Sequence, residues 1–92
     1  MIECRVVIHN RLGLHARAAA QLVRTATTFQ SAIRLERVDG SATADAKSIL
    51  SVLLLAASRG SELVATAEGA DEEAALEAVC GLFEGGFGEE KA

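Results

Sequence analysis

The chain has 92 residues, a formal net charge of -4, and a hydrophobic content of 50% with only 3% aromatic residues. This length predicts a single domain spanning 1–92, with a core built mostly from aliphatic side chains and alanine. The acidic balance argues against a general nucleic-acid-binding protein. The apolar run 49–57 is far shorter than a bilayer span, so we expect no membrane insertion.

The first half of the chain predicts a strand, a helix and a hairpin. Alternating apolar residues over 2–8 are typical of a half-buried strand. A helical period follows, and its buried stripe consists of Ala19, Leu22, Val23, Ala26 and Phe29. Alternation returns over 32–37, which predicts a second strand. Asp39 and Gly40 then predict a hairpin turn into a short strand over 41–44.

The second half predicts a short helix, a strand and a final helix. The period over 49–57 favours a buried face made of Ile49, Val52, Leu53 and Ala56. Leu50 and Leu54 lie at its edge, where a side chain belongs either to the core or to a contact patch. A strand over 61–67 follows, then a final helix whose first turn holds Asp71, Glu72 and Glu73 and which Gly85 and Gly86 end. Its buried stripe consists of Ala75, Leu76, Val79 and Phe83, and a tail over 87–92 follows.

The order of these elements, βαββαβα, predicts an α+β fold. One four-stranded antiparallel sheet with three helices packed on one face buries every apolar stripe. Cys4 and Cys80 lack metal-ligand or redox spacing, so we expect two buried, reduced thiols in a cytoplasmic protein. Glu3 and Arg5 interrupt the first apolar run, so no signal peptide is expected. We expect no metal ion and no cofactor.

The segment 10–20 carries the strongest functional signal. Gly13 provides a turn, and His15 falls at the start of the helix with Arg17 two residues later. Helix N-termini present unpaired N–H groups and partial positive charge, which favour anions. Histidine is an unusual N-cap residue, because Ser, Thr, Asp and Asn are preferred. On these residues alone, an ordinary solvated surface histidine remains the alternative reading.

The charges also suggest a partner at this end of the molecule. Basic residues gather early in the chain and acidic residues gather from 68 to 90. Gln21 and Arg24 fall on the same helix face as Arg17. We therefore expect an acidic partner to dock at the His15 end, with Gln21 and Arg24 in the contact surface.

The motif Gly-Leu-His-Ala-Arg over 13–17 resembles the active-site motif of the HPr family, the phosphocarrier proteins of the bacterial phosphotransferase system. Further resemblance lies at 46–50, 59–63 and 69–74, in the same order along the chain. The resemblance implies an HPr-like open-faced sandwich. It also implies that enzyme I phosphorylates a ring nitrogen of His15 with a group from phosphoenolpyruvate, assisted by Arg17. The group then passes to an EIIA-type acceptor, so the protein acts as a carrier rather than a stand-alone enzyme.

Ser48 matches a second site of this family, which an HPr kinase/phosphorylase modifies in some members. A phosphate there would put charge beside Ile49 and Leu50, which are candidate docking residues. The simpler interpretation of Ser48 is a helix N-cap. The alternative function is a regulatory binding module that acts through protein contacts and Ser48 phosphorylation rather than as a carrier.

Two features distinguish this chain within the resemblance. Ala18 stands where the family usually has proline, which is well tolerated in a first helical turn. A slightly long hairpin at Asp39 and Gly40, together with the segments 10–13 and 82–87, resembles the nitrogen-related (NPr) branch. We expect a monomer that binds no nucleic acid.

Overall fold

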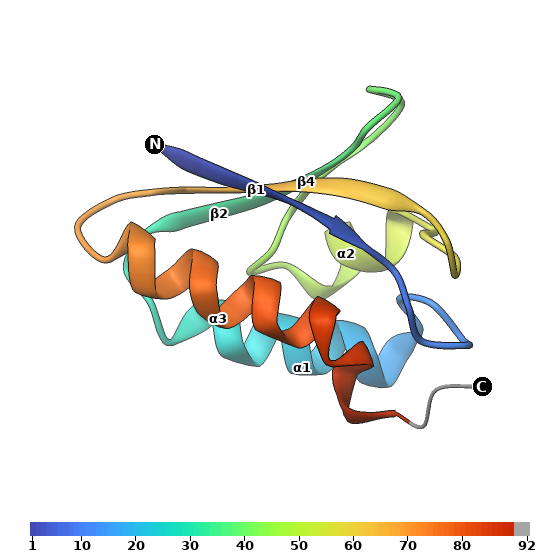
Figure 1. Cartoon of the computed structure of the whole chain (residues 1–92). Coiled ribbons are helices and arrows are strands. Elements are labelled where there is room, and N and C mark those ends of the chain that lie inside the picture. The colour runs from blue at the N-terminus through green and yellow to red at the C-terminus, as the bar shows by residue number, and fades with distance from the viewer. Residues whose placement is uncertain (90–92) are drawn as a thin grey trace.

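The computed structural model describes residues 1–89 of the chain, and Figure 1 shows how its elements are arranged. Their order is β1 (Ile2–Val7), α1 (Ala16–Thr27), β2 (Ala32–Arg37), β3 (Thr43–Asp45), α2 (Ile49–Leu54), β4 (Glu62–Glu68), α3 (Glu72–Glu84) and the 3₁₀ turn η1 (Gly86–Gly88). The predicted order of strands and helices is confirmed.

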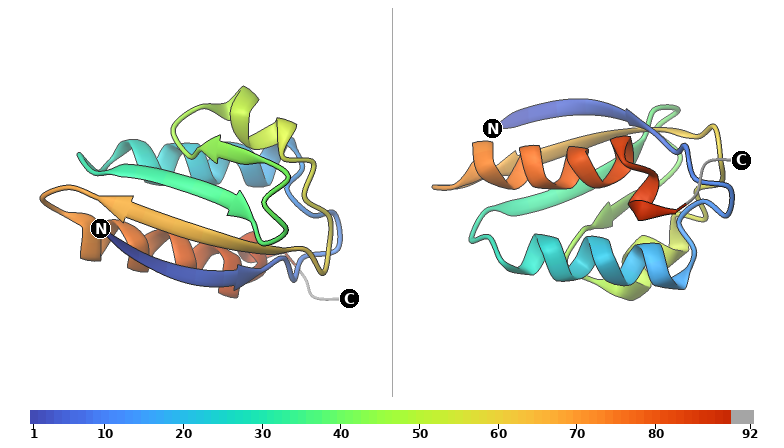
Figure 2. Two further views of the ribbon diagram at one scale, coloured as in Figure 1. Left: turned by 90° about the horizontal axis from the view of Figure 1, so that it is seen from above. Right: turned by 60° about the horizontal axis from the view of Figure 1, so that its bottom comes forward.

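The four strands form one sheet in the order β1-β4-β2-β3, and every neighbouring pair is antiparallel. The central strand β4 places Ala65 opposite Cys4 of β1 and opposite Leu35 of β2. Figures 1 and 2 show the three helices on one side of the sheet, with the other side uncovered. The predicted open-faced α+β sandwich is therefore confirmed.

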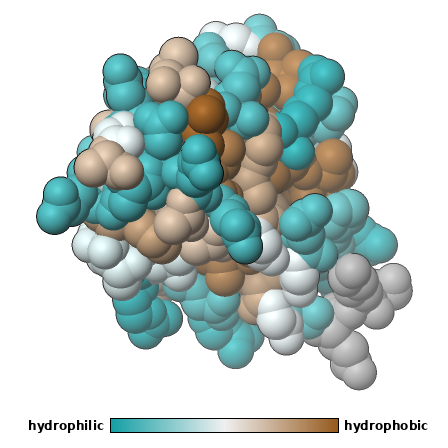
Figure 3. Space-filling view, turned by 60° about the vertical axis from the view of Figure 1, so that its left-hand side comes forward, coloured by the Kyte–Doolittle hydropathy of each residue, from teal (hydrophilic) through white to brown (hydrophobic). Residues whose placement is uncertain are grey.

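The core lies between the sheet and the helices and is mostly aliphatic. The strands bury the residues that alternation placed inward, including Val6, Ile33 and Leu35, and α3 buries the predicted stripe that ends at Phe83. On the face shown in Figure 3, hydrophilic residues predominate and hydrophobic ones form smaller patches between them. Within residues 1–89, no helix has the length and apolar character needed to cross a membrane.

Helix α2 corrects one sequence prediction. It has six residues and buries Val52, while Leu55 and Ala57 after it are also buried. Three residues that were expected to be buried are exposed: Ile49 (44%), Leu53 (37%) and Ala56. A helix of less than two turns cannot carry a continuous stripe, so the chain that leaves it supplies the remaining core contacts.

The segment after α3 corrects a second prediction, because its described part is not a free tail. Gly86 and Phe87 are buried, and the Phe87 ring packs edge-on against Phe83 with ring centroids 5.0 Å apart. The chain then turns back toward the start of α1 (Figure 1). Residues 90–92 of the expected tail lie outside the described residues.

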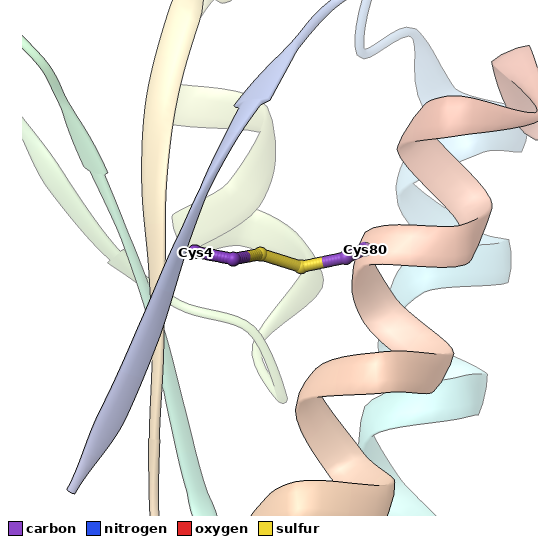
Figure 4. Close-up of a disulfide and its surroundings, with 2 residues drawn as sticks. All are labelled: Cys4 and Cys80. Atoms are coloured by element: carbon purple, nitrogen blue, oxygen red, sulfur yellow. A yellow bond between two sulfur atoms is a disulfide. The ribbon is translucent and has the colours of Figure 1, made fainter.

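The cysteines correct a third prediction. Cys4 of β1 and Cys80 of α3 are joined by a disulfide, and both residues are half-buried (Figure 4). Sequence spacing gave no signal for this pair, because 76 positions separate the two residues. The antiparallel fold places the first strand directly against the last helix and so brings the two sulfur atoms together.

Candidate functional site

A tight turn between β1 and α1 presents the candidate site. The buried Asn10 side chain donates from Nδ2 to the Gly13 carbonyl oxygen at 2.7 Å, and the Gly13 N–H donates to the Asn10 carbonyl at 3.2 Å. The Leu14 N–H then donates to the Ala57 carbonyl at 2.9 Å. Gly13 has φ of +66°, and a Cβ there would lie 2.5 Å from the Ala57 oxygen, so this turn requires glycine.

His15 is the N-cap of α1, as predicted. Its backbone is extended (φ -75°, ψ 177°), and its carbonyl accepts from the Ala19 N–H at 2.8 Å. Its side chain replaces the usual hydroxyl or carboxylate cap, because Nδ1 accepts from the Arg17 N–H at 3.2 Å. The imidazole is only 21% exposed, and the Arg17 side chain beside it is exposed.

Glu89 contacts the other nitrogen of the same ring. One carboxylate oxygen, Oε2, is hydrogen-bonded to His15 Nε2, and Oε1 accepts from Asn10 Nδ2 at 3.3 Å. The bond from His15 holds the pKa of Glu89 below its usual value. The Asn10 bond and the nearby charge of Arg17 also lower this pKa, against partial burial, which raises it. Glu89 is therefore a carboxylate at neutral pH.

The predicted docking residues of α1 have different surroundings. Arg24 is exposed in the last turn of the helix, where its charge is available to a partner. Gln21 is half-buried, and its Nε2 donates to the Phe87 carbonyl oxygen at 3.2 Å. Gln21 therefore holds the segment after α3 against α1, a contact that the helix pattern gave no reason to expect.

Ser48 and the leucines after it form the second predicted region. Ser48 is the N-cap of α2, and its Oγ accepts from the Ser51 N–H at 3.3 Å, so the simpler capping interpretation is confirmed. Leu50 is 65% exposed, more so than Ile49. The exposed apolar residues here, which we call the α2 patch, are Ile49, Leu50, Leu53 and Leu54.

Sequence reasoning missed two residues at the site. Asn10 carried a weak signal, because its amide closes a turn onto Gly13 three residues later. Glu89 carried none, because its contact with His15 spans 74 positions and depends on the turn after α3.

The comparisons with known proteins identify the family. The family model described as "PTS HPr component phosphorylation site" matches residues 2–85. The chain is 43% identical over 90 residues to the phosphocarrier protein HPr of Xylella fastidiosa, covering 98% of this chain and 99% of the relative. It is also 43% identical over 86 residues to the phosphocarrier protein NPr of Proteus mirabilis, covering 94% of each. The chain is equally identical to an HPr and to an NPr, so these two comparisons do not distinguish between the two branches.

A solved structure extends the similarity to three dimensions. The crystal structure of HPr-C-His from Thermoanaerobacter tengcongensis matches with a TM-score of 0.91 and 43% identity, covering 98% of this chain and 99% of that one. The family model and these relatives span nearly the whole chain. The chain therefore belongs to the HPr family of phosphocarrier proteins of the phosphotransferase system.

Proposed function

We propose that His15 is the phosphoryl-carrying residue of this protein. Phosphorylated enzyme I, charged from phosphoenolpyruvate, donates the group, and an EIIA-type protein accepts it in sugar uptake or in a nitrogen-related regulatory branch. The observation that carries the proposal is the hydrogen bond from the Arg17 N–H to His15 Nδ1. A ring nitrogen that accepts a hydrogen bond carries a lone pair, and a lone pair is what a nucleophile needs.

Phosphorylation at Nδ1 would use the same N–H group in a second way. The Nδ1 lone pair forms the new P–N bond while the bond from phosphorus to the donor breaks, and that electron pair leaves with the donor. Nδ1 then no longer accepts a hydrogen bond. The Arg17 N–H is therefore free to donate to a phosphoryl oxygen at the positive end of α1.

The Arg17 side chain supports the same role. It is exposed at the N-terminus of α1, and its charge lowers the pKa of the nearby Glu89, so its guanidinium acts electrostatically at this site. A guanidinium can pair with two phosphoryl oxygens at once. We propose that Arg17 balances the charge of the phosphoryl group during transfer.

Partner docking is proposed over the exposed Arg24 and the α2 patch. An acidic partner should associate more slowly as salt rises, because charge steers the encounter. Arg24→Glu should weaken binding to enzyme I, and Arg34→Glu, which changes an exposed arginine of β2, is the matched control. Equal binding by both variants at all salt concentrations would show that Arg24 lies outside the interface.

Two histidine variants test the proposed phosphoryl site. His15→Ala should fold, because it removes a capping bond worth about 1 kcal/mol and one further bond, to Glu89, yet accept no label from phosphoenolpyruvate and enzyme I. His9→Ala changes an exposed histidine before the turn and should accept label as the parent does. The label in the parent should be acid-labile, as expected of a phosphohistidine. Label on His15→Ala, or an acid-stable label in the parent, would contradict the assignment.

A cytoplasmic location is part of this proposal, since the proposed donor system uses phosphoenolpyruvate. Disulfides are rare in the reducing cytosol, so a cytoplasmic location requires that the Cys4–Cys80 bond of the structure be open in cells. Alkylation of cells at the moment of lysis, followed by mass spectrometry, should find both cysteines modified. If both cysteines escape alkylation because they are joined by the disulfide, the protein lies in an oxidising compartment or its disulfide is inaccessible to cellular reductants.

A further inference from the structure

The hydrogen bonds of the His15 ring show which of its two nitrogens carries the proton. The ring is hydrogen-bonded at both nitrogens, to the Arg17 N–H through Nδ1 and to the Glu89 carboxylate through Nε2. A backbone N–H only donates, and an ionised carboxylate only accepts. Both bonds form at once only when Nδ1 is unprotonated and Nε2 carries the proton.

We propose that Glu89 is a positioning residue for phosphoryl transfer through His15, because its carboxylate holds the proton on Nε2 and so keeps the lone pair on Nδ1. The proposal rests on the proposed role of His15. Carboxylates that accept from a histidine ring fix its tautomer and orientation in the same way behind metal ions and catalytic serines.

Glu89 would also balance charge after the group has arrived. When Nδ1 forms the P–N bond, the proton on Nε2 stays in place and the ring becomes an imidazolium. The carboxylate beside Nε2 neutralises this positive charge. When the group leaves, the P–N electron pair returns to Nδ1 and the neutral ring is restored. No proton moves in either direction, so transfer needs no separate acid or base.

The fold holds Glu89 at the ring through the turn after α3. Gly86, Phe87 and Gly88 all have left-handed backbone conformations, with φ of 62°, 57° and 74°. Phe87 is non-glycine, and such a residue persists there only when its surroundings hold it. Its ring is buried, and Gln21 bonds its carbonyl. Figures 1 and 2 show this turn returning toward the loop before α1.

Asn10 fixes the carboxylate from the other side. Its Nδ2 donates both to the Gly13 carbonyl and to Glu89 Oε1. One buried amide therefore joins the turn that positions His15 to the carboxylate that orients its ring. The Glu89 side chain is only 19% exposed, so it is held within the site and is not a freely moving surface charge.

The test compares Glu89→Gln with Glu89→Asp and with Glu84→Gln, which removes the same charge from an exposed position of α3. Nitrogen-15 spectra of the histidine ring read the tautomer without any phosphoryl donor. The parent and Glu84→Gln should show a proton on Nε2 alone, and Glu89→Gln, in which only the Arg17 N–H still favours this tautomer, should show a smaller share of it. Glu89→Asp should recover part of the parent pattern.

Kinetics with enzyme I and phosphoenolpyruvate give the second readout. Glu89→Gln should lower kcat for phosphorylation of the carrier about 10-fold, as for other groups that orient a histidine, and leave KM unchanged. A change in KM alone would show that Glu89 acts in docking to enzyme I and would overturn the proposal. An unchanged or higher kcat, or an unchanged tautomer of the ring, would also overturn it. Amide spectra confirm that each variant is folded, and Glu89→Asp keeps the test decisive if Glu89→Gln unfolds.

Failure of the proposed function would look different. In that case the parent would take no label, or His15→Ala would still take it, whatever the tautomer of the ring. A parent that is phosphorylated on His15 and is indifferent to Glu89→Gln would reject only the role of Glu89.

Discussion

Replacing Gly13 with alanine should destabilise the protein far more than the same change at Gly40. Both glycines have positive φ, +66° and +76°, so alanine at either position meets the same left-handed penalty of roughly 1–2 kcal/mol. They differ in their surroundings. A Cβ on Gly40 has nothing within 4 Å, whereas one on Gly13 would lie 2.5 Å from the Ala57 carbonyl oxygen and 2.9 Å from Ser58 Cα.

The extra cost at Gly13 follows from what must move. Both close atoms are backbone, so the turn and the segment after α2 must separate. That movement breaks the bond from the Leu14 N–H to the Ala57 carbonyl, worth about 1 kcal/mol, and disturbs packing by roughly 1–3 kcal/mol. Gly13→Ala should therefore lose about 2–4 kcal/mol more than Gly40→Ala.

Urea denaturation at equilibrium, followed by circular dichroism, measures this difference. Gly40→Ala should shift the midpoint slightly and leave phosphorylation unchanged. Gly13→Ala should shift it strongly, and any folded fraction should be phosphorylated poorly because the turn positions His15. Equal midpoints for the two variants would refute the argument that close backbone contact, rather than positive φ alone, requires glycine at position 13.

Three further predictions concern other parts of the fold. Ala18→Pro should raise the free energy of unfolding by about 0.4–1 kcal/mol, and a lower urea midpoint would show that the ring does not fit this fully buried position. Reducing the Cys4–Cys80 bond opens a loop of 76 positions and should lower the free energy of unfolding by about 4.5 kcal/mol through loop entropy. The urea midpoint of a double alanine variant should be the same with and without reductant. Bonds from the Ser31 side chain and from backbone N–H groups lower the pKa of Asp71 from 3.8 to about 2. The stability that the ionised carboxylate contributes is present above about pH 4 and is lost as the pH falls toward 2. The urea midpoint of Asp71→Asn should therefore change less between these two pH values than the midpoint of the parent.

The sequence predicted the fold well because its signals are local. Alternation in the strands and the helical period in α1 and α3 each depend on neighbours within a few positions. The turn at Gly13 and the N-cap at His15 are also local, and both are confirmed. The short helix α2 was predicted less well, since six residues are too few for a period to define a buried face.

Other features that the sequence did not predict join distant parts of the chain. The Cys4–Cys80 disulfide and the bonds from Glu89 to His15 and Asn10 each span more than seventy positions. Such contacts depend on how the helices cover the sheet. Neither spacing nor residue type reveals them before the fold is known.

The strand order β1-β4-β2-β3 also constrains when the protein can form during synthesis. Strand β1 is made first, yet within residues 1–89 its sole strand partner is β4, which ends at Glu68. Until the ribosome has released that strand, the β2–β3 hairpin is the only pairing of the described sheet that can form. Pairings that must wait for distant segments fold slowly. A nascent chain stalled before β4 would therefore expose its apolar strand and helix faces to chaperones, and contact with Glu89 would complete the His15 site only after α3 and the turn that follows it have been made.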